Sequence, residues 1–287
     1  MYRILRAEEL AANIFRMDVE APRVARHCLP GQFIIARTSE QGERIPLTIC
    51  DYDSEKGIIT IVFQPTGEST LKMSELKAGD AFDDFVGPLG CPSELCSTPL
   101  EELKKKNIVF VGGGVGTAPV YPQLKWLHEH GITADCIIGA RTKDLIILEK
   151  EMSAVSNLYL TTDDGSYIRK GMGTDVLKDL VVNQGKHYDL CIAIGPMIMM
   201  KFVTLTTREY SLRTTVSLNA LMVDGTGMCG ACRVSVGGKT LFTCVDGPEF
   251  DGHQVDFDEA MRRQAMYRNL ESEANENHNH KCNCYGK

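Results

Sequence analysis

Residues Asp224-Gly-Thr-Gly-Met-Cys-Gly-Ala-Cys232 set one carboxylate and two thiols at short, fixed intervals in a glycine-rich stretch. A third thiol, Cys244, follows after a short run that is typical of a strand. Plant-type [2Fe–2S] sites place one ligand, then four residues, then Cys-x2-Cys, then a distant cysteine. This stretch keeps that register, with Asp224 first and then Cys229, Cys232 and Cys244. We therefore predict a [2Fe–2S] site with one oxygen ligand.

Two other kinds of site accept a similar set of side chains. A structural zinc site can also use three thiolates and a carboxylate, but zinc ribbons usually pair two Cys-x2-Cys knuckles, and this stretch has one. A redox Cys-x-x-Cys opens a helix after a strand, whereas this one lies in a glycine-rich loop. We prefer the cluster and keep zinc and free thiols as alternatives.

Composition limits the class of protein. The chain has 287 residues, a formal net charge of −7 and no long basic run, so we expect no nucleic-acid partner. The N-terminus lacks an apolar signal core and no apolar segment is long enough to span a bilayer, so we expect a cytoplasmic protein with no membrane partner. In that compartment the 11 cysteines do not imply disulfides.

The first third of the chain, residues 1–100, alternates β-rich runs with turns, as in Gln32–Arg37 and Ile58–Phe63. This pattern predicts a small antiparallel barrel. Within it, Arg44 offers a cationic fork suited to a pyrophosphate, and Thr48 could donate a hydrogen bond to a flavin ring.

A glycine followed by hydroxyls, Gly67-Glu-Ser69-Thr70, precedes a helix that we predict over residues 71–76. A helix N-terminus with free N–H groups is an anion site, so the barrel is expected to bind a dinucleotide such as FAD. The alternative is that Ser69 or Thr70 only caps the helix.

The middle third, residues 101–217, has the βαβ rhythm of a doubly wound parallel sheet. The buried-strand pattern of residues 107–111 leads into Gly112-Gly-Gly-Val-Gly-Thr-Ala-Pro119. This loop is similar to the dinucleotide fingerprint but does not match it, because position 117 is threonine and the acidic ribose reader is missing. The Gly195-Pro196 turn and the segment 162–167 are expected to line the same crevice.

The order of parts suggests an electron path from a nicotinamide nucleotide through flavin to a [2Fe–2S] module at residues 218–260. Nicotinamide passes two electrons as hydride, a cluster takes one at a time, and flavin mediates between them.

The chain to about residue 260 resembles the ferredoxin–NADP reductase superfamily. Within it the chain is similar to the small electron-transfer subunits of NADH-dependent reduced ferredoxin:NADP oxidoreductases, sulfide dehydrogenases and dihydroorotate dehydrogenases. The shared motifs are Arg44-Ile-Pro-Leu-Thr48, Gly87-Pro-Leu-Gly90, Gly112–Pro119, Thr162-Asp-Asp-Gly-Ser166, Gly195-Pro-Met197, Met222–Arg233 and Cys244-Val-Asp-Gly-Pro-Glu-Phe250.

The resemblance implies cofactors and the residues that hold them. NAD(H) is expected to meet FAD directly, so that hydride transfer requires no catalytic acid or base. Glu68 stands where many relatives have lysine, which weakens the expected FAD phosphate contact. The implied FAD residues are Arg44, Pro46, Leu47, Thr48, Gly67, Ser69 and Thr70, and the implied NAD residues are Gly114, Gly116, Thr117, Asp164, Gly195 and Pro196.

The resemblance also implies partners. Such subunits work with a larger flavoprotein that carries a second FAD and [4Fe–4S] clusters and gives access to ferredoxin; this chain has no four-cysteine set of its own for a [4Fe–4S] cluster. Aspartate at the first ligand position is typical of the bifurcating ferredoxin type, and cysteine of the dihydroorotate type. The alternatives are a sulfide or polysulfide dehydrogenase subunit and a zinc-stapled, non-enzymatic module.

The last residues, 261–287, read as a polar helix over 261–270 followed by a polar tail. His278, His280, Cys282 and Cys284 are able to bind a metal, but a solvated terminus is the preferred interpretation.

Overall fold

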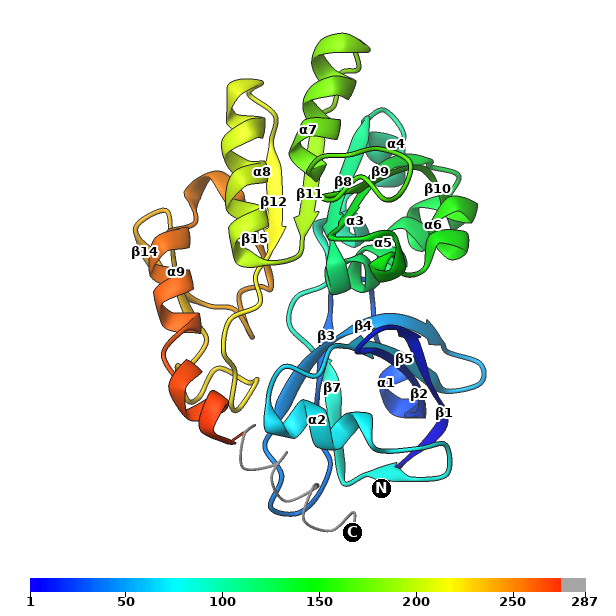
Figure 1. The fold of residues 1–287 in the computed structure, drawn as a ribbon, viewed down its shortest axis with the longest axis vertical. Helices are drawn as coiled ribbons and strands as arrows, with labels where there is room; N and C mark the ends of the chain where they lie inside the picture. The colour runs from blue at the N-terminus through cyan, green and yellow to red at the C-terminus, as the bar shows by residue number, and fades with distance from the viewer. Residues whose placement is uncertain (275–287) are drawn as a thin grey trace.

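An antiparallel barrel, an α/β lobe and a small cysteine-bearing module make up the computed structural model, which describes residues 1–274 (Figure 1). The barrel is nearly closed, with strand order β6-β1-β2-β5-β4-β3-β7, and its two edge strands are consecutive in the chain. The expected barrel is therefore confirmed. Its strands are β1 (Tyr2–Ala11), β2 (Ile14–Glu20), β3 (Phe33–Arg37), β4 (Ile45–Asp53), β5 (Ile58–Phe63), β6 (Ala81–Phe82) and β7 (Asp84–Leu89).

Strand β3 is buried on both faces. Ile34 and Ala36 point into the barrel core, whereas Phe33 and Ile35 pack against cysteines of the C-terminal module. Because side chains alternate along a strand, one strand serves both contacts. Short helices α1 (Pro22–Ala25) and α2 (Glu68–Ser74) complete the barrel.

The α/β lobe contains the expected doubly wound sheet. Its order is β10-β9-β8-β11-β12-β15, with parallel pairing from β10 to β12 and an antiparallel β15. The chain switches sides of the sheet between β8 and β11, where ligands bind in folds of this type. The strands are β8 (Ile108–Gly113), β9 (Ala134–Ala140), β10 (Ser156–Thr162), β11 (Leu190–Ile194), β12 (Thr214–Ser217) and β15 (Glu249–Asp251).

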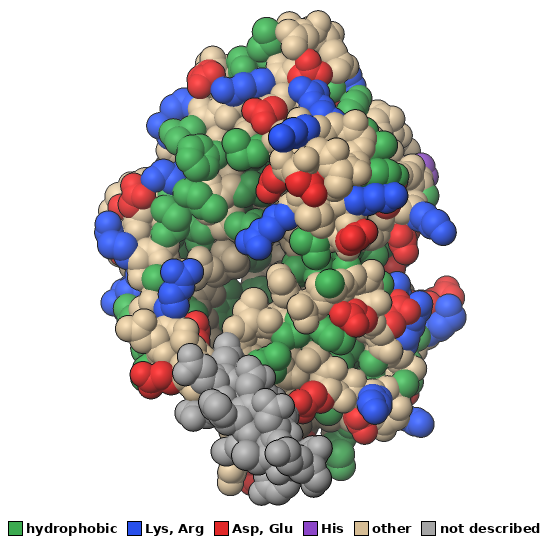
Figure 2. All heavy atoms as spheres, in the orientation of Figure 1, with side chains coloured by type: hydrophobic (Ala, Val, Ile, Leu, Met, Phe, Trp, Pro, Cys, Tyr) green, Lys and Arg blue, Asp and Glu red, His purple; other side chains and the backbone are tan. Residues whose placement is uncertain are grey.

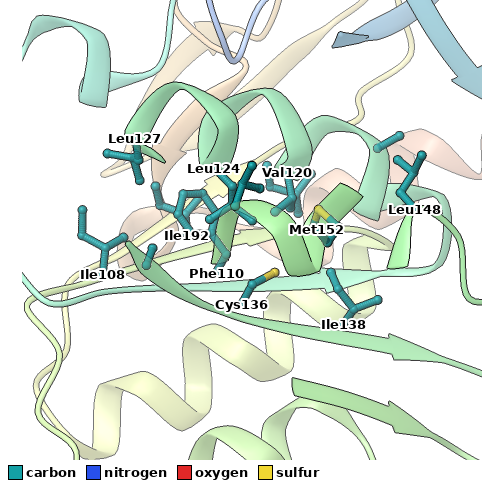
Figure 3. Close-up of a cluster of buried hydrophobic side chains, with 14 of the residues drawn as sticks. Ile108, Phe110, Val120, Leu124, Leu127, Cys136, Ile138, Leu148, Met152 and Ile192 are labelled. Carbon is teal, nitrogen blue, oxygen red and sulfur yellow. The ribbon is translucent and has the colours of Figure 1, made fainter. Parts of the chain in front are cut away.

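Helices cover both faces of this sheet. Val120 and Leu124 of α5 pack over Phe110 on one face (Figure 3), while Val109 and Val111 contribute to the core on the other face. This alternation along β8 places a nonpolar layer on each side. The helices are α3 (Glu94–Ser97), α4 (Leu100–Leu103), α5 (Thr117–Glu129), α6 (Glu149–Val155), α7 (Gly173–Lys178) and α8 (Met197–Glu209), with one-turn helices at 114–116, 143–145 and 179–183.

The module that carries the cysteines holds the two-stranded sheet of β13 (Arg233–Val236) and β14 (Lys239–Phe242), then a one-turn helix at 252–254 and α9 (Phe257–Gln264). Its strand β15 joins the sheet of the α/β lobe, so the module and the lobe are continuous there. The domain division at residues 100, 217 and 260 remains a prediction.

Two helices begin earlier in the chain than the sequence predicts. The barrel helix begins at Glu68 rather than at residue 71, because the Thr70 hydroxyl accepts the Gly67 N–H and closes the first turn. The C-terminal helix α9 begins at Phe257 rather than at 261, because the Asp256 side chain caps it by accepting the Glu259 N–H. The predicted tail ligands at 278, 280, 282 and 284 lie outside the described residues.

The surface of the described residues carries both charged and hydrophobic side chains. Ile198, Phe202 and Leu205 leave apolar side chains exposed along α8, and hydrophobic side chains gather on that part of the surface in Figure 2. Within residues 1–274, no helix has both the length and the apolar character needed to cross a membrane.

Candidate electron-transfer site

Cys232 and Cys244 form a buried pair. Their Sγ atoms lie 3.2 Å apart, and the Cys244 N–H points at the Cys232 sulfur at 3.5 Å. Both cysteines are free, and the spacing is longer than the roughly 2 Å of a disulfide. Burial, followed by the contact with Cys232, raises the pKa of Cys244 to about 12. Such a pair ionises readily only beside a cation, which is the behaviour of metal ligands.

Cys229 and Asp224 lie together in the preceding loop. Backbone N–H groups, that of Ala231 above all and then those of Asp224 and Val223, lower the pKa of Cys229, although burial opposes them. N–H groups that stabilise a thiolate are also suited to the sulfurs of a cluster. Cys229 also acts electrostatically on Cys244 and contributes to its raised pKa.

The Asp224 carboxylate organises its own loop. Its Oδ2 accepts hydrogen bonds from Thr226 N at 2.9 Å, Thr226 Oγ1 at 2.6 Å and Met228 N at 3.2 Å. These bonds lower the pKa of Asp224, with the Thr226 hydroxyl the largest cause. The carboxylate is thus ionised at neutral pH beside Cys229, as a ligand must be. Its role as a ligand remains a prediction.

The donor set suits a two-iron cluster better than a single ion. Among the described residues, no three His, Cys, Asp or Glu side chains gather as a single metal ion requires. Cys232 Sγ and Cys244 Sγ lie 3.2 Å apart, and a [2Fe–2S] cluster, which takes two protein ligands on each iron, does not need all four side chains at one ion. We conclude that the residues present fit the cluster predicted from the sequence.

The barrel supplies one wall of this site. Phe33 and Ile35 of β3 pack against Cys232 and Cys244. A Cβ on Gly225 would lie 2.4 Å from Ile35 Cδ1, so only glycine lets the loop approach this closely. The loop and β3 are therefore in direct contact.

Arg44 joins the barrel to the cluster loop. Its Nε donates to the Val223 carbonyl at 3.0 Å, and its Nη2 donates to the Asp224 carbonyl at 3.2 Å. The sequence led us to expect a pyrophosphate contact here. In the structure the fork of this side chain binds carbonyls next to a candidate ligand.

The other predicted FAD residues gather near Arg44 but have partners within the chain. The neighbouring Glu43 accepts a hydrogen bond from Ser69, which brings the start of α2 against the start of β4. Thr70 accepts from Gly67 N at 3.1 Å, the capping contact that was considered as an alternative. Pro46, Leu47 and Thr48 lie on β4, paired with Ile35, Ile34 and Phe33 of β3 respectively.

The glycine loop after β8 meets the turn after β11. A Cβ on Gly116 would lie 2.4 Å from the Ile194 carbonyl oxygen and 2.6 Å from Gly195 Cα. Thr117 follows, and its buried hydroxyl oxygen has no hydrogen-bond partner. Gly114 has open space beside it. The two loops are therefore in direct contact at the switch point, where the predicted nucleotide site lies.

Pro196 and Asp164 occupy two further strand ends of the same lobe. Pro196 is the residue before α8, and a Cβ on Gly113 would lie 3.5 Å from its Cδ. Asp164 follows β10 and uses Oδ1 to accept from Ser166 N at 2.9 Å and Ser166 Oγ at 2.7 Å. Asp164 therefore shapes its loop, and a nucleotide contact there is still a prediction.

Sequence reasoning missed Phe33, Ile35 and Glu43. Phe33 and Ile35 lie in a run in which every residue is apolar, so alternation does not show which face meets a second module. Glu43 precedes Arg44 in a turn with no motif of its own. These contacts exist only once the barrel and the C-terminal module have docked.

Comparisons with known proteins support the site. Residues 219–256 match the family described as the iron–sulfur cluster binding domain of dihydroorotate dehydrogenase B. A Thermotoga maritima protein, a homologue of the dihydroorotate dehydrogenase B (NAD(+)) electron transfer subunit, is 46% identical over 93% of this chain and 92% of its own length. The chain belongs to the dihydroorotate dehydrogenase B type family of electron transfer subunits.

Other relatives refine the position within this family. A protein from the adh 3′ region of Clostridium beijerinckii is 61% identical over 100% of this chain and 99% of its own. The structure of an NADH-dependent reduced ferredoxin-NADP oxidoreductase matches with a TM-score of 0.89 and 44% identity, over 96% of this chain and 97% of that one. The expected ferredoxin–NADP reductase fold with a C-terminal iron–sulfur domain is thus confirmed, as is the role of an electron-transfer subunit in a flavin-dependent oxidoreductase.

Proposed function

We propose that this electron transfer subunit serves a complex that couples NADH, NADPH and ferredoxin by electron bifurcation. The observation that carries the proposal is Asp224 at the first position of the cluster motif, where the dihydroorotate type has cysteine. The 44% identity to the NADH-dependent reduced ferredoxin-NADP oxidoreductase supports the same assignment. The preference for NAD over NADP is part of the proposal. The 2′-phosphate of NADP is usually bound by basic side chains, and near the expected ribose position this chain offers only Arg141 and Lys143.

Each cofactor has its residues in this proposal. Asp224, Cys229, Cys232 and Cys244 would together hold the two irons of the cluster. The segment from Arg44 to Thr48 and the start of α2 hold FAD, which, when bound, exchanges hydride with NAD(H) and single electrons with the cluster. The contact between Gly116 and Gly195 shapes the seat of the NAD pyrophosphate, and the free Thr117 hydroxyl donates to it. Phe33 and Ile35 exclude water from the cysteine pair.

The partner in this proposal is a larger flavoprotein with a second FAD and [4Fe–4S] clusters. The family consists of electron transfer subunits, which deliver electrons to another chain. At the cluster loop, Val223 is 57% exposed and Met228 is 88% exposed, two apolar side chains beside the candidate ligands. A surface of this kind is suited to contact with that partner.

A visible spectrum with iron and zinc analysis of the purified small subunit tests the cofactors. We expect flavin and [2Fe–2S] absorbance with two irons per small subunit. A colourless protein that contains zinc would support the zinc-stapled module instead. An assay with ferredoxin and with polysulfide separates bifurcation from the sulfide dehydrogenase alternative.

A second experiment tests Asp224. The variant Asp224→Cys should assemble a cluster with a changed reduction potential, because thiolate replaces a harder oxygen ligand. A control, Asp246→Asn, changes a nearby carboxylate that caps Phe242 N at 2.7 Å and is not among the ligands. An unchanged potential in Asp224→Cys would remove this residue from the ligand set.

A further inference from the structure

Glu249 stands where the three parts of the molecule meet. It begins β15, five positions after Cys244 in the sequence, and pairs with Ser217 at the end of β12. Its side chain reaches α5, whose first turn follows the nucleotide loop, and also reaches Gly31 just before β3. One carboxyl group thus touches the α/β lobe, the barrel and the chain that leaves the cysteine pair.

The carboxyl group is bonded on one side only. Gln123 Nε2 donates to Oε1 at 2.7 Å. Oε2 is buried and has no hydrogen-bond partner. A Cβ on Gly31 would lie 3.2 Å from Oε1, so the backbone at Gly31 packs closely against this oxygen. Burial of a carboxylate oxygen without a hydrogen-bond donor raises the free energy of the charged form and therefore favours the protonated form.

No cation balances Glu249. None of the described lysines or arginines forms an ion pair with it, and Arg213 binds the neighbouring Glu94 instead. Burial raises the pKa of Glu249 to about 7, although hydrogen bonds from Ser93 and Gln123 oppose this. The groups that face it are Glu94 and Cys96 from α3, and the neutral Ser93, Gln123, Ser217 and Gly31 from the other elements.

Asp135 shows that this fold can hold a buried carboxylate charged. Lys186 Nζ donates to it at 2.6 Å, Tyr188 Oη at 2.5 Å and Asn157 Nδ2 at 2.9 Å. Burial opposes ionisation there too, but these partners prevail and the pKa of Asp135 is lowered. Glu249 has no lysine and no tyrosine partner, and its side-chain donors are the neutral Gln123 and Ser93.

We propose that Glu249 is a redox-linked proton site, which binds one proton from solvent as one electron enters the cluster module and releases it as that electron leaves. The electron originates in NADH and the proton in solvent, so carboxylate plus proton gives the neutral acid and the junction gains no net charge. Glu94, next in the chain to Ser93 and partly exposed, lies on the solvent side. The proposal rests on the proposed function, because it requires the cluster.

The coupling follows from Coulomb's law. A negative charge added on the cysteine side disfavours a second negative charge at Glu249 and so favours its protonation. By the same linkage, protonation of Glu249 makes reduction easier. The reduction potential should therefore fall as the pH rises through the range in which Glu249 titrates.

The test is a redox titration of the cluster in the intact complex, followed by electron paramagnetic resonance at several pH values around neutrality. For each tenfold change in proton concentration we expect a shift approaching about 59 mV in the native protein, the value for one proton per electron. Glu249→Gln keeps the shape and the amide contact but cannot titrate, so its potential should not vary with pH. The matched control Glu209→Gln removes an exposed carboxylate and should behave as the native protein.

A second measurement does not depend on folding of a variant. Infrared difference spectra of the native complex, reduced minus oxidised, should show a protonated carboxyl band that shifts in heavy water. An equal pH slope in Glu249→Gln and the native protein, or no such band, would overturn the proposal. A native complex without a cluster would instead defeat the proposed function.

Discussion

The cluster loop and the nucleotide loop are both rich in glycine, but they need it for different reasons. In the cluster loop, Gly225 and Gly227 have φ of 83° and 88°, a backbone conformation that side chains oppose. In the nucleotide loop, Gly113 and Gly116 do not have positive φ, yet a Cβ on either would lie 2.4 Å from a neighbouring atom.

The difference shows how each loop meets its ligand. The cluster loop is exposed and curls its backbone so that N–H groups point inward, at Asp224 Oδ2 and at the cysteines. The nucleotide loop is wedged between β8, β11 and α8, so that its backbone becomes a rigid surface. At Gly227 the requirement is chiefly one of conformation and at Gly116 chiefly one of space, and substitutions at these two positions should separate the two requirements.

The largest effect is expected from removal of a ligand. Cys232→Ser should abolish cluster absorbance and bound iron while flavin stays bound, because the serine hydroxyl is a poor replacement for a buried thiolate. Iron analysis and the visible spectrum measure this. The control is Cys91→Ser, an exposed cysteine that contacts the Val245 carbonyl. Full iron content in Cys232→Ser would show that the cysteine pair is not the cluster site.

Gly116→Ala should have the next largest effect. The added Cβ meets the Ile194 carbonyl and Gly195 Cα, which are backbone atoms that cannot turn aside. We expect a loss of about 1–3 kcal/mol of stability and at least a tenfold weaker NAD affinity, measured by thermal unfolding and nucleotide titration. Gly139→Ala is the control, with its nearest neighbours at 3.7 Å. Native affinity in Gly116→Ala would mean that the wedge does not shape the nucleotide site.

Gly227→Ala tests conformation in the cluster loop. The left-handed backbone should cost about 1–2 kcal/mol, while the only close side chain, the exposed Val245, can turn away. Iron loading should fall and NAD affinity should stay unchanged. Gly238→Ala carries a similar strain, at φ 75°, in the turn between β13 and β14 and serves as the control. Equal iron loss in both variants would point to general destabilisation.

The smallest effect is expected for Arg44→Lys. Lysine keeps the charge but loses the planar fork that binds the Val223 and Asp224 carbonyls. The cost should be about 0.5–1.5 kcal/mol, seen as slightly faster release of FAD and iron during gel filtration. Arg23→Lys on α1, an exposed position, is the control. A complete loss of flavin in Arg44→Lys would show that the arginine chiefly binds the cofactor.

The cluster motif and the order of the lobes could be predicted because their signals are local. Asp224 and the cysteines lie within one short segment, and the buried runs of the α/β lobe are punctuated by glycine turns. The strand at residues 58–63 was predicted with its observed bounds, since turn residues flank it on both sides. Local chemistry of this kind can be read without knowledge of tertiary contacts.

Contacts between distant segments could not be predicted in the same way. Arg44 offers five donors to any acceptor, and nothing nearby in the sequence indicates the carbonyls of Val223 and Asp224. Gln123 and Glu249 are ordinary polar residues until α5 and β15 are packed together. Such pairs depend on how the barrel, the α/β lobe and the C-terminal module dock, and the hydrophobic periodicity of the sequence carries no information about that docking.

The wall that β3 gives to the cysteine pair has a consequence for biosynthesis. Phe33 and Ile35 leave the ribosome long before Cys232 and Cys244, and N-terminal domains generally fold first during synthesis. The barrel can therefore fold before the thiols emerge, and the wall that covers them is then already formed. A fragment that begins after the barrel would lack this wall and leave the cysteine pair open to water and oxidants.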